Sequence, residues 1–247
     1  GILLLNFIAQ CKTELGTMPK DPVAVTTIVS TDMVNGIAKD YGIEIRRTLT
    51  GFKYIGEQIL GLERAGEADR FVFGFEESYG YLAGTYVRDK DAVVTSMLIC
   101  EMAAYYRRQG KSLVQVINEL YDRYGYYQNT TLSYSFEGAE GMEIMAGKMS
   151  FMREHPFREI AGMKVVKTAD YQLSEAVDLA TGQKTEIKLP KSNVLSYSLE
   201  GGAAVIVRPS GTEPKIKVYV TSVGKDLAHA SQITKRLGDF MSGVINQ

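Results

Sequence analysis

The sequence predicts an α/β protein in two parts: a three-layer α/β/α domain with a mixed, mostly parallel sheet, then a smaller α+β domain with an antiparallel sheet and flanking helices. Strand-length and helix-length segments alternate through the first half of the 247 residues, whereas consecutive strand-like runs fill the second half. Hydrophobic residues at 45% and charged residues at 23% are typical of folded domains and exclude a disordered chain or a disulfide scaffold. We therefore expect domains at residues 1–124 and 125–247.

The elements of the first domain follow from its apolar runs and its helix-breaking residues. The opening run GILLLNFIA predicts a buried helix, because a membrane-spanning helix needs about 20 apolar residues. After the breaker cluster TMPKDP, the β-branched run VAVTTIV predicts a strand. Ser30, Thr31 and Asp32 are N-cap candidates for the next helix, which Gly42 closes. Strands are predicted at residues 23–29, 43–48, 70–75 and 81–87. Helices are predicted at residues 1–9, from the N-cap candidates at 30–32 through residue 40, and at 51–64, 91–108 and 112–124.

The pattern changes near Arg123–Tyr127, where we place the domain boundary. Gly125 lies at this point, and we expect it to act as a hinge. Beyond it, strands are predicted at residues 126–136, 163–168, 193–199, 203–208 and 215–222. Helices are predicted at residues 138–154 and 226–245, so that consecutive strands are enclosed by helices.

Charge and cysteine content restrict the function further. The chain has 28 Lys plus Arg and 29 Asp plus Glu, a formal net charge of −1, which argues against a nucleic-acid partner. Cys11 and Cys100 lie far apart and outside any CxxC pair, so a reducing compartment, the cytoplasm, is expected. No membrane partner is expected. Because the chain opens at Gly1 within an apolar run, we also expect further sequence upstream.

The segment AAVIVRPSGTEPKIKVYVTS, residues 203–222, consists of two β runs joined by a tight turn. Ser210, Gly211 and Thr212 offer hydroxyls and backbone amides in that turn, and Arg208 adds a planar, permanently charged guanidinium. These groups suit an anion such as phosphate. The alternative is an ordinary hairpin turn with a solvated arginine.

A second candidate is the segment GFEESYG, where Glu76, Glu77 and Ser78 follow an apolar strand. Ligands bind beyond the carboxyl ends of strands in open α/β sheets. A carboxylate accepts hydrogen bonds from hydroxyls, so it is well suited to recognise a sugar diol. The glutamates are alternatively a general acid and base pair, or solvated loop charges.

Two short motifs lie at the beginnings of predicted helices. In RDKD, Asp89 or Asp91 is expected to be an N-cap, while Lys90 is unusual at a helix N-terminus and suits an anionic ligand. In TLTGFK, a hydroxyl, a glycine and Lys53 occupy a strand-to-helix turn, whose plain alternative is a capping turn. No P-loop, GxGxxG, GxSxG or HExxH motif is present, and His155 and His229 are far apart in sequence.

Taken together, TGFK (50–53), FGFEESYGY (73–81), RDKD (88–91) and RPSGTEPKIKVY (208–219) closely resemble the α-D-phosphohexomutases, the phosphoglucomutase and phosphomannomutase family. The order and spacing match, and the resemblance covers essentially the whole chain. At residues 76–78, in the loop that the resemblance assigns to sugar binding, this chain has EES. This form resembles the phosphoglucomutases, whereas EMS is usual in the dual-specificity enzymes of the family.

The resemblance implies a four-domain enzyme that moves a phosphoryl group between the C1 and C6 oxygens of a hexose, through a phosphoserine and a bisphosphate. This chain resembles domains three and four: a sugar-binding domain truncated at its N-terminus (1–124) and a phosphate-binding domain (125–247). The nucleophile loop of the TASHNP type and the DxDxD magnesium loop are missing, so no catalytic or metal residue is assigned here and the fragment alone is expected to be inactive. The substrate contacts implied by the match are Thr50, Gly51, Glu76, Ser78 and Lys90. The implied phosphate contacts are Arg208, Ser210, Gly211, Thr212 and Lys217.

The resemblance further implies Mg²⁺ and glucose 1,6-bisphosphate as cofactors of the full-length enzyme, neither bound by this fragment. The implied partners are a hexose phosphate substrate and the missing N-terminal domains of the same chain. The expected activity is the interconversion of glucose 1-phosphate and glucose 6-phosphate. Phosphomannomutase specificity and a non-catalytic sugar-phosphate-binding module are the alternatives.

Overall fold

A computed structural model describes residues 1–138 and 140–246. The chain divides into two compact units, Gly1–Gly125 (unit 1) and Tyr126–Gln247 (unit 2), and each has its own sheet. The sheet of unit 1 is mostly parallel and that of unit 2 is antiparallel, which confirms the predicted fold class.

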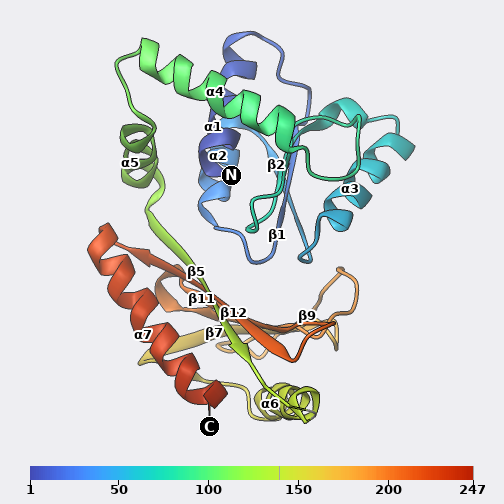
Figure 1. The fold of residues 1–247 in the computed structure, drawn as a ribbon, viewed down its shortest axis with the longest axis vertical. Coiled ribbons are helices and arrows are strands. Elements are labelled where there is room, and N and C mark those ends of the chain that lie inside the picture. The colour runs from blue at the N-terminus through green and yellow to red at the C-terminus, as the bar shows by residue number, and fades with distance from the viewer. Residues whose placement is uncertain (139, 247) are drawn as a thin grey trace. The chain divides into compact units, whose positions relative to one another are not determined.

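Unit 1 is a four-stranded sheet with helices on both faces (Figure 1). The strand order is β2-β1-β3-β4; β1 is parallel to β2 and β3, and β4 is antiparallel to β3. The strands are β1 (Val23–Thr27), β2 (Glu44–Thr48), β3 (Phe71–Phe75) and β4 (Tyr81–Leu82). The helices are α1 (Ile2–Glu14), α2 (Met33–Tyr41), α3 (Phe52–Arg64), α4 (Ala92–Arg108) and α5 (Leu113–Tyr124), with a 3₁₀ turn at Ala68–Arg70.

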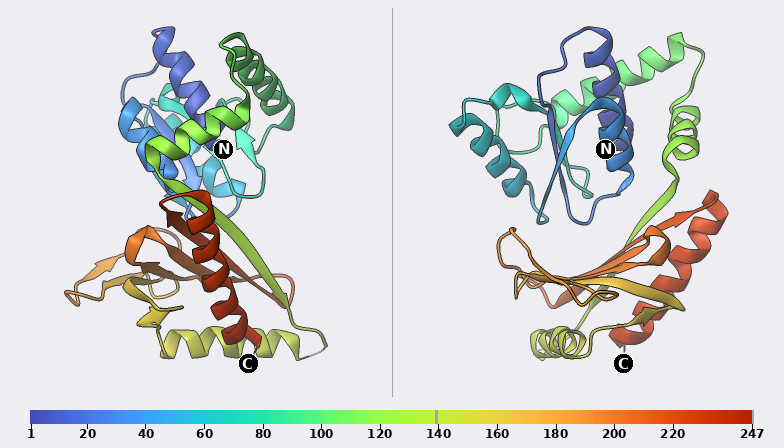
Figure 2. Two further views of the ribbon diagram at one scale, coloured as in Figure 1. Left: turned by 90° about the vertical axis from the view of Figure 1, so that its left-hand side faces the viewer. Right: turned by 180° about the vertical axis from the view of Figure 1, so that it is seen from behind.

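Two hydrophobic clusters make the three layers of unit 1. One packs α1, α2, α4 and α5 against residues such as Ala24 and Phe73; the other packs α3 against Val23, Val25 and Phe71. The right-hand view of Figure 2 shows α3 and α1 on opposite sides of the sheet. An irregularity in the pairing of β1 with β3 explains how Phe71 and Phe73 serve different clusters. Val23 pairs with Phe71 but Ala24 pairs with Phe73, so β3 has one extra residue, Val72, at this point. This bulge places Phe71 and Phe73 on opposite faces of the sheet.

Unit 2 is an antiparallel sheet in the order β5-β12-β11-β10-β7-β8-β9, with β6 paired to β7. Its helices α6 (Gly141–Glu154) and α7 (Leu227–Asn246) share one hydrophobic core with the sheet (Figure 1). The strands are β5 (Tyr126–Ser135), β6 (Glu159–Ile160), β7 (Met163–Asp170), β8 (Glu175–Asp178), β9 (Lys184–Glu186), β10 (Leu195–Leu199), β11 (Ala204–Pro209) and β12 (Lys215–Gly224), with a 3₁₀ turn at Glu200–Gly202.

Strand β12 shows how the unit 2 sheet separates its faces. Ile216, Val218 and Val220 are buried in the core with α6 and α7, and they alternate with Lys215 and Lys217. Successive side chains of a strand point to opposite faces, so the two lysines lie on the face away from those helices.

Most predicted elements are present, but two predicted strands are too long. The strand predicted at residues 23–29 ends at Thr27, and the one predicted at 81–87 covers only Tyr81–Leu82, because it pairs only with Gly74 and Phe75 and the chain bends at residues 84–86. The first helix continues five residues beyond the apolar run, to Glu14, and Asp91 and Gly42 cap helices as expected. Strands β6, β8 and β9 were not predicted. All three residues of β9 are exposed, so this edge strand lacks the apolar alternation that identifies a half-buried strand.

The segment that joins the units begins at a well-held helix end. Tyr124 Oη donates to Asp40 Oδ2 at 2.5 Å, and Arg123 pairs with the same carboxylate at 2.7 Å. Gly125 follows with φ 106° and ψ 155°, a backbone conformation that favours glycine, and β5 starts at Tyr126. The hinge at Gly125 stays a prediction.

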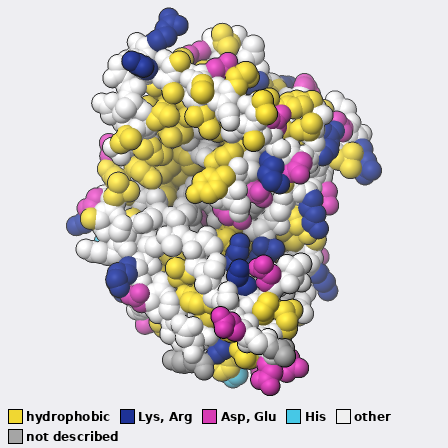
Figure 3. All heavy atoms as spheres, viewed as in Figure 1, with side chains coloured by type: hydrophobic (Ala, Val, Ile, Leu, Met, Phe, Trp, Pro, Cys, Tyr) yellow, Lys and Arg dark blue, Asp and Glu magenta, His cyan; other side chains and the backbone are white. Residues whose placement is uncertain are grey.

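The surface mixes charges with apolar areas. Lysine and arginine side chains are interspersed with acidic ones on the face shown in Figure 3, as the near-neutral net charge leads one to expect. Hydrophobic side chains gather over unit 1, and the exposed residues of α4 and α5 include Val93, Met97 and Val114. Within residues 1–138 and 140–246, no helix is long and apolar enough to cross a membrane.

Candidate functional site

The topology of unit 1 brings two candidate segments to one edge of its sheet. Strand β1 lies between β2 and β3, and all three are parallel. The residues after each strand therefore meet at the carboxyl edge, where the chain leaves β1 and β3 in different directions. This edge carries the Thr50–Gly51 turn after β2 and the Glu76–Gly80 loop after β3.

Gly51 shapes the first of these segments. It precedes α3 with φ 119° and ψ 127°, outside the regions that residues with a Cβ adopt readily. Gly51 gives α3 no side-chain cap, and the first amides of a helix have no partner within the helix, so the amides at the start of α3 are available to a ligand at the end of β2. Phe52 is buried and anchors the turn in the core beneath α3.

The Glu76–Gly80 loop is closed by a backbone hydrogen bond from Glu76 N to Gly80 O of 2.9 Å. Tyr79 takes a positive φ of 62° within it. A Cβ at Gly80 would lie 2.6 Å from Glu76 Oε1, so a larger residue there would displace the Glu76 side chain from its observed position. Ser78 is exposed at the tip of the loop, and Glu76 is half-buried.

The surroundings of Glu76 make its charged form less favourable than that of a fully solvated glutamate. Burial raises the pKa of this carboxyl group above its ordinary value, the charges of Glu77 and Asp89 raise it further, and Lys90 opposes them. A partly desolvated carboxylate with few neighbouring donors gains from hydroxyl groups that hydrogen-bond to it. A sugar supplies such hydroxyls.

The RDKD segment rests on α3 because Gly56 has no side chain. A Cβ at Gly56 would lie 2.7 Å from the carbonyl oxygen of Arg88, whose guanidinium pairs with Glu63 of the same helix. Lys90 Nζ lies 5.6 Å from the centroid of the Phe52 ring and 2.9 Å from Asp89 Oδ1. Lys90 thus joins the beginning of α3 to the neighbourhood of Glu76.

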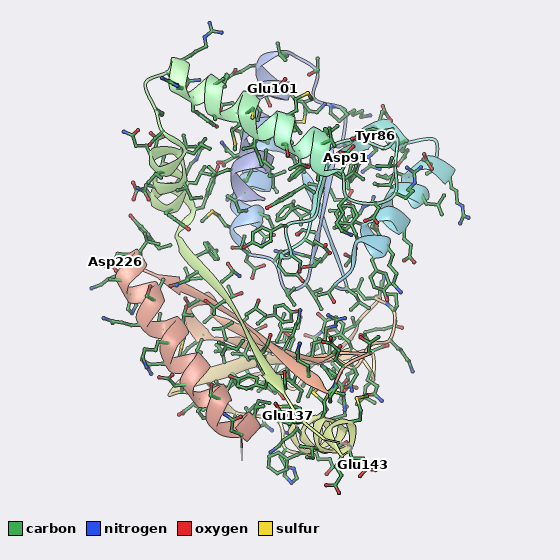
Figure 4. The ribbon with its side chains drawn as sticks, viewed as in Figure 1. Tyr86, Asp91, Glu101, Glu137, Glu143 and Asp226 are labelled. Atoms are coloured by element: carbon green, nitrogen blue, oxygen red, sulfur yellow. The ribbon has the colours of Figure 1, made fainter. Side chains whose placement is uncertain are left out.

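Asp91 fixes the end of the same segment. Its carboxylate accepts from Val94 N at 3.0 Å and from Tyr86 Oη at 2.7 Å, and its amide donates to Tyr81 O at 2.9 Å. Figure 4 shows Tyr86 and Asp91 side by side at the start of α4. Asp91 is therefore the N-cap, and Asp89 is left to pair with Lys90.

Sequence reasoning missed two residues at this edge and gave Glu77 no separate role. Thr27 ends β1 and donates to Glu77 Oε2 at 2.8 Å, and Ser30 Oγ lies 3.0 Å from Thr27 Oγ1. The signal was present in the hydroxyl-rich end of the strand, TTIVS at residues 26–30, which was read only as β-branched residues and a helix cap.

In unit 2, the phosphate candidates lie on the β11–β12 hairpin. Arg208 and Lys217 are directly opposite each other, and within residues 1–138 and 140–246 neither has an ion-pair partner. Like charges directly across a sheet repel each other, which favours an anion between them. Lys217 also pairs in register with Ser133 of β5, a hydroxyl on the same face.

The hairpin turn has its own hydrogen bonds. Ser210 N donates to Lys215 O at 2.7 Å, and Ser210 Oγ accepts weakly from the amides of Thr212 and Glu213, at 3.4 and 3.3 Å. Gly211 and Thr212 are exposed at the tip. The turn thus presents a serine hydroxyl and backbone amides held by long, weak bonds, which an anion can replace.

The structure brings Thr50, Gly51, Glu76, Ser78 and Lys90 to one edge of unit 1, and the five phosphate candidates to one hairpin of unit 2. In the described part of the chain, no three His, Cys, Asp or Glu side chains converge as a metal ion requires. The residues present therefore do not fit a magnesium site.

Comparison with known families matches both units. The description "Phosphoglucomutase/phosphomannomutase, alpha/beta/alpha domain III" matches residues 2–124, and "Phosphoglucomutase/phosphomannomutase, C-terminal domain" matches residues 160–234. Among curated proteins, a phosphoglucomutase of Staphylococcus aureus strain MRSA252 is 36% identical over 232 residues, which is 94% of this chain and 41% of that protein. One of strain bovine RF122 / ET3-1 is 37% identical over 221 residues, 90% and 39% of the two chains. The chain thus spans about two fifths of the length of these relatives.

Solved structures show the same fold at low sequence identity. The open form of pp63/parafusin, a phosphoglucomutase from Paramecium, matches with a TM-score of 0.64 and 17% identity, over 99% of this chain and 41% of that one. A phosphoglucomutase/phosphomannomutase family protein from Burkholderia thailandensis matches with a TM-score of 0.57 and 12% identity, over 98% and 40%.

Proposed function

This chain belongs to the phosphoglucomutase/phosphomannomutase family, and on that premise we propose that it is the substrate-binding C-terminal part of a hexose-phosphate mutase. Unit 1 binds hydroxyls of the sugar, and unit 2 binds the phosphate that is not reacting. The observation that carries the proposal is the presence of two chemistries: a half-buried carboxylate at the edge of unit 1, and on unit 2 the opposed Arg208 and Lys217, which have no ion-pair partner in the described part of the chain.

In unit 1, Glu76 accepts hydrogen bonds from two neighbouring sugar hydroxyls, and Ser78 at the exposed tip adds a hydroxyl contact. Thr50 and the amides after Gly51 contact the same ligand from the start of α3, and Lys90 offers a positive charge beside them. In unit 2, the guanidinium of Arg208 and the ammonium of Lys217 hold the phosphate, with Ser210, Gly211 and Thr212 beneath it.

This division suits a reaction in which the sugar is accepted in two orientations. A mutase grips hydroxyls that exchange places when the sugar turns by half a revolution, together with a remote phosphate. Binding energy from the remote phosphate then positions the reacting end. The phosphoserine, the bisphosphate intermediate, Mg²⁺ and glucose 1,6-bisphosphate belong to the proposal for the complete protein, and the residues described here bind and orient the substrate. A cytoplasmic location is part of the same proposal.

We favour glucose 1-phosphate and glucose 6-phosphate as substrates, because the EES form of the sugar loop resembles the phosphoglucomutases and both curated relatives carry that name. Mannose phosphates are the alternative substrates, since discrimination depends on contacts to a single hydroxyl. A sugar-phosphate-binding module without catalysis is the alternative of a different class.

The test is a pair of measurements. The complete protein encoded by the gene is assayed for conversion of glucose 1-phosphate and mannose 1-phosphate, and the 247-residue chain is titrated calorimetrically with the same compounds, glucose and inorganic phosphate. Conversion of glucose 1-phosphate by the complete protein supports the mutase. Binding without conversion supports the module. If the complete protein neither binds nor converts these compounds, both proposals are refuted.

A further inference from the structure

Thr27, the last residue of β1, and Ser30, three residues further on, carry buried hydroxyls that the substrate contacts proposed above do not use. Thr27 is 0% exposed and Ser30 is 8% exposed. A carboxylate only accepts hydrogen bonds and a hydroxyl has one proton, so Thr27 donates its proton to Glu77. In the contact between Thr27 and Ser30, the donor must then be Ser30. The hydrogen bonds therefore run in one direction, from Ser30 through Thr27 to Glu77.

The position of Thr27 in the sheet explains why it reaches the loop after β3. The last pair between β1 and β3 joins Thr26 to Phe75, so Thr27 lies level with the beginning of the Glu76–Gly80 loop. Thr26 Oγ1 donates to the carbonyl of Phe75 at 2.9 Å. Two consecutive threonines of β1 thus hold the end of β3. Thr26 bonds to the β3 backbone at Phe75, and Thr27 bonds to the side chain of Glu77 in the loop that follows.

Glu77 links this buried strand end to the exposed tip of the loop. One of its carboxylate oxygens accepts from Thr27, and Ser78 Oγ lies 3.5 Å from the other, a weak contact that a ligand can replace. The Glu77 carboxylate is thus turned toward β1, whereas the Glu76 carboxylate lies over Gly80 and within the electrostatic influence of Lys90.

We propose that Glu77 is a positioning residue and not a sugar ligand, and that Thr27 and Ser30 hold it so that Glu76 and Ser78 present their oxygen atoms to the hexose. The inference rests on the proposed function. Thr27, on the central strand, then acts on the affinity for the sugar without touching it. This role has a signature that a direct ligand lacks, because the effects of Thr27 and Glu77 are coupled.

The test compares four variants of the complete protein: Thr27→Val, Thr27→Ser, Glu77→Gln and the double variant Thr27→Val/Glu77→Gln. Thr27→Val keeps the shape and removes the hydroxyl, and we expect the dissociation constant for glucose 1-phosphate to rise roughly 10-fold, the change that losing one hydrogen bond to a charged group produces. Thr27→Ser keeps the hydroxyl and stays close to the unaltered protein. The double variant binds no more weakly than Glu77→Gln alone.

Two results of the binding measurements would overturn the inference. One is a Thr27→Val variant that binds as tightly as the unaltered protein; the other is a double variant whose loss is the product of the two single losses, as expected if Glu77 contacts the sugar independently of Thr27. If Thr27→Val does not fold, Ser30→Ala removes the outer hydroxyl at lower cost, and a smaller loss of affinity is expected from it. Ser222→Ala, which removes a buried hydroxyl from unit 2, controls for lost stability and leaves the affinity unchanged.

A measurement without ligand separates this inference from the proposed function. In the free protein, amide hydrogen exchange at Glu76, whose N–H bonds to Gly80 O, becomes about 10-fold faster in Thr27→Val and stays slow in Thr27→Ser. Unchanged exchange refutes the positioning role even if no sugar phosphate binds. Absence of binding by the unaltered protein, with the exchange altered as expected, refutes only the proposed function.

Discussion

Arg208 and Lys217 lie directly opposite each other on antiparallel strands β11 and β12, on the sheet face away from α6 and α7. Two positive charges in register destabilise a sheet by about 0.2–1 kcal/mol relative to an uncharged pair. The rest of β11 and β12 is strongly apolar on the core side, which offsets this cost. An arrangement that is unfavourable in the free hairpin and favourable with an anion is what a phosphate site requires.

Arg208→Ala separates stability from binding. Removing one of the two opposed charges leaves the free energy of unfolding unchanged or raises it by up to about 1 kcal/mol. The dissociation constant for glucose 1-phosphate rises roughly 10- to 100-fold, because a charge-assisted bidentate contact is lost. Calorimetric titration and urea unfolding measure the two effects. Lys188→Ala, an exposed lysine of the same unit, is the control; equal losses of affinity for glucose and glucose 1-phosphate would contradict the phosphate assignment.

Glu76 makes stability depend on pH in a direction that the structure defines. Its pKa in the folded chain is raised above the ordinary 4.5, chiefly by burial, so the folded state binds more protons than the unfolded state above that pH. Raising the pH through this window therefore lowers the free energy of unfolding. Glu76→Gln removes this contribution, and its stability relative to the unaltered chain should increase between about pH 4 and about pH 7. Urea unfolding at both pH values checks this, and a difference independent of pH would refute it.

Gly56 and Gly61 provide a matched pair within α3. A Cβ at Gly56 meets the carbonyl oxygen of Arg88 at 2.7 Å, whereas a Cβ at Gly61 meets nothing within 4 Å. Gly61→Ala is therefore expected to raise the free energy of unfolding by about 0.5–1 kcal/mol, the helix-propensity gain. Gly56→Ala gains the same propensity but displaces the RDKD segment, so we expect lower stability and weaker binding of glucose 1-phosphate. The prediction fails if both substitutions stabilise equally.

Ser222 joins β12 to α7 by buried hydrogen bonds. Its hydroxyl donates to Ala230 O at 2.8 Å and lies 2.7 Å from Thr234 Oγ1, which must be the donor in that contact. Ser222→Ala leaves the Thr234 hydroxyl without its acceptor and should lower the free energy of unfolding by about 1–3 kcal/mol. The double variant Ser222→Ala/Thr234→Val removes the orphaned group and should recover part of that loss. Thermal unfolding compares them, and additive losses would contradict this account.

The sequence predicted most elements because their signals are local. Each of these signals depends on residues close together in the chain: Gly42 at the end of α2, the capping Asp91 of α4, and the alternation of buried and less buried residues in β12. Strand β9 escaped prediction because this exposed edge strand has no buried face to give alternation, and β8 has only four residues, of which Ala176 alone is buried. The motifs around Glu76 and Arg208 were recognised as candidates from residue types in turns, and their roles stay predictions.

By itself, the sequence determined the mixed α/β class, the family resemblance and the residues that bear chemical groups, since composition and motif order need no coordinates. The tertiary structure alone decided which groups meet. Thr27 and Glu77 are 50 positions apart and are joined only because β1 and β3 are parallel neighbours. Arg88 rests on Gly56, and Arg208 opposes Lys217, because of backbone approach and strand register. Such contacts depend on packing across the sheet, for which a single sequence carries no local signal.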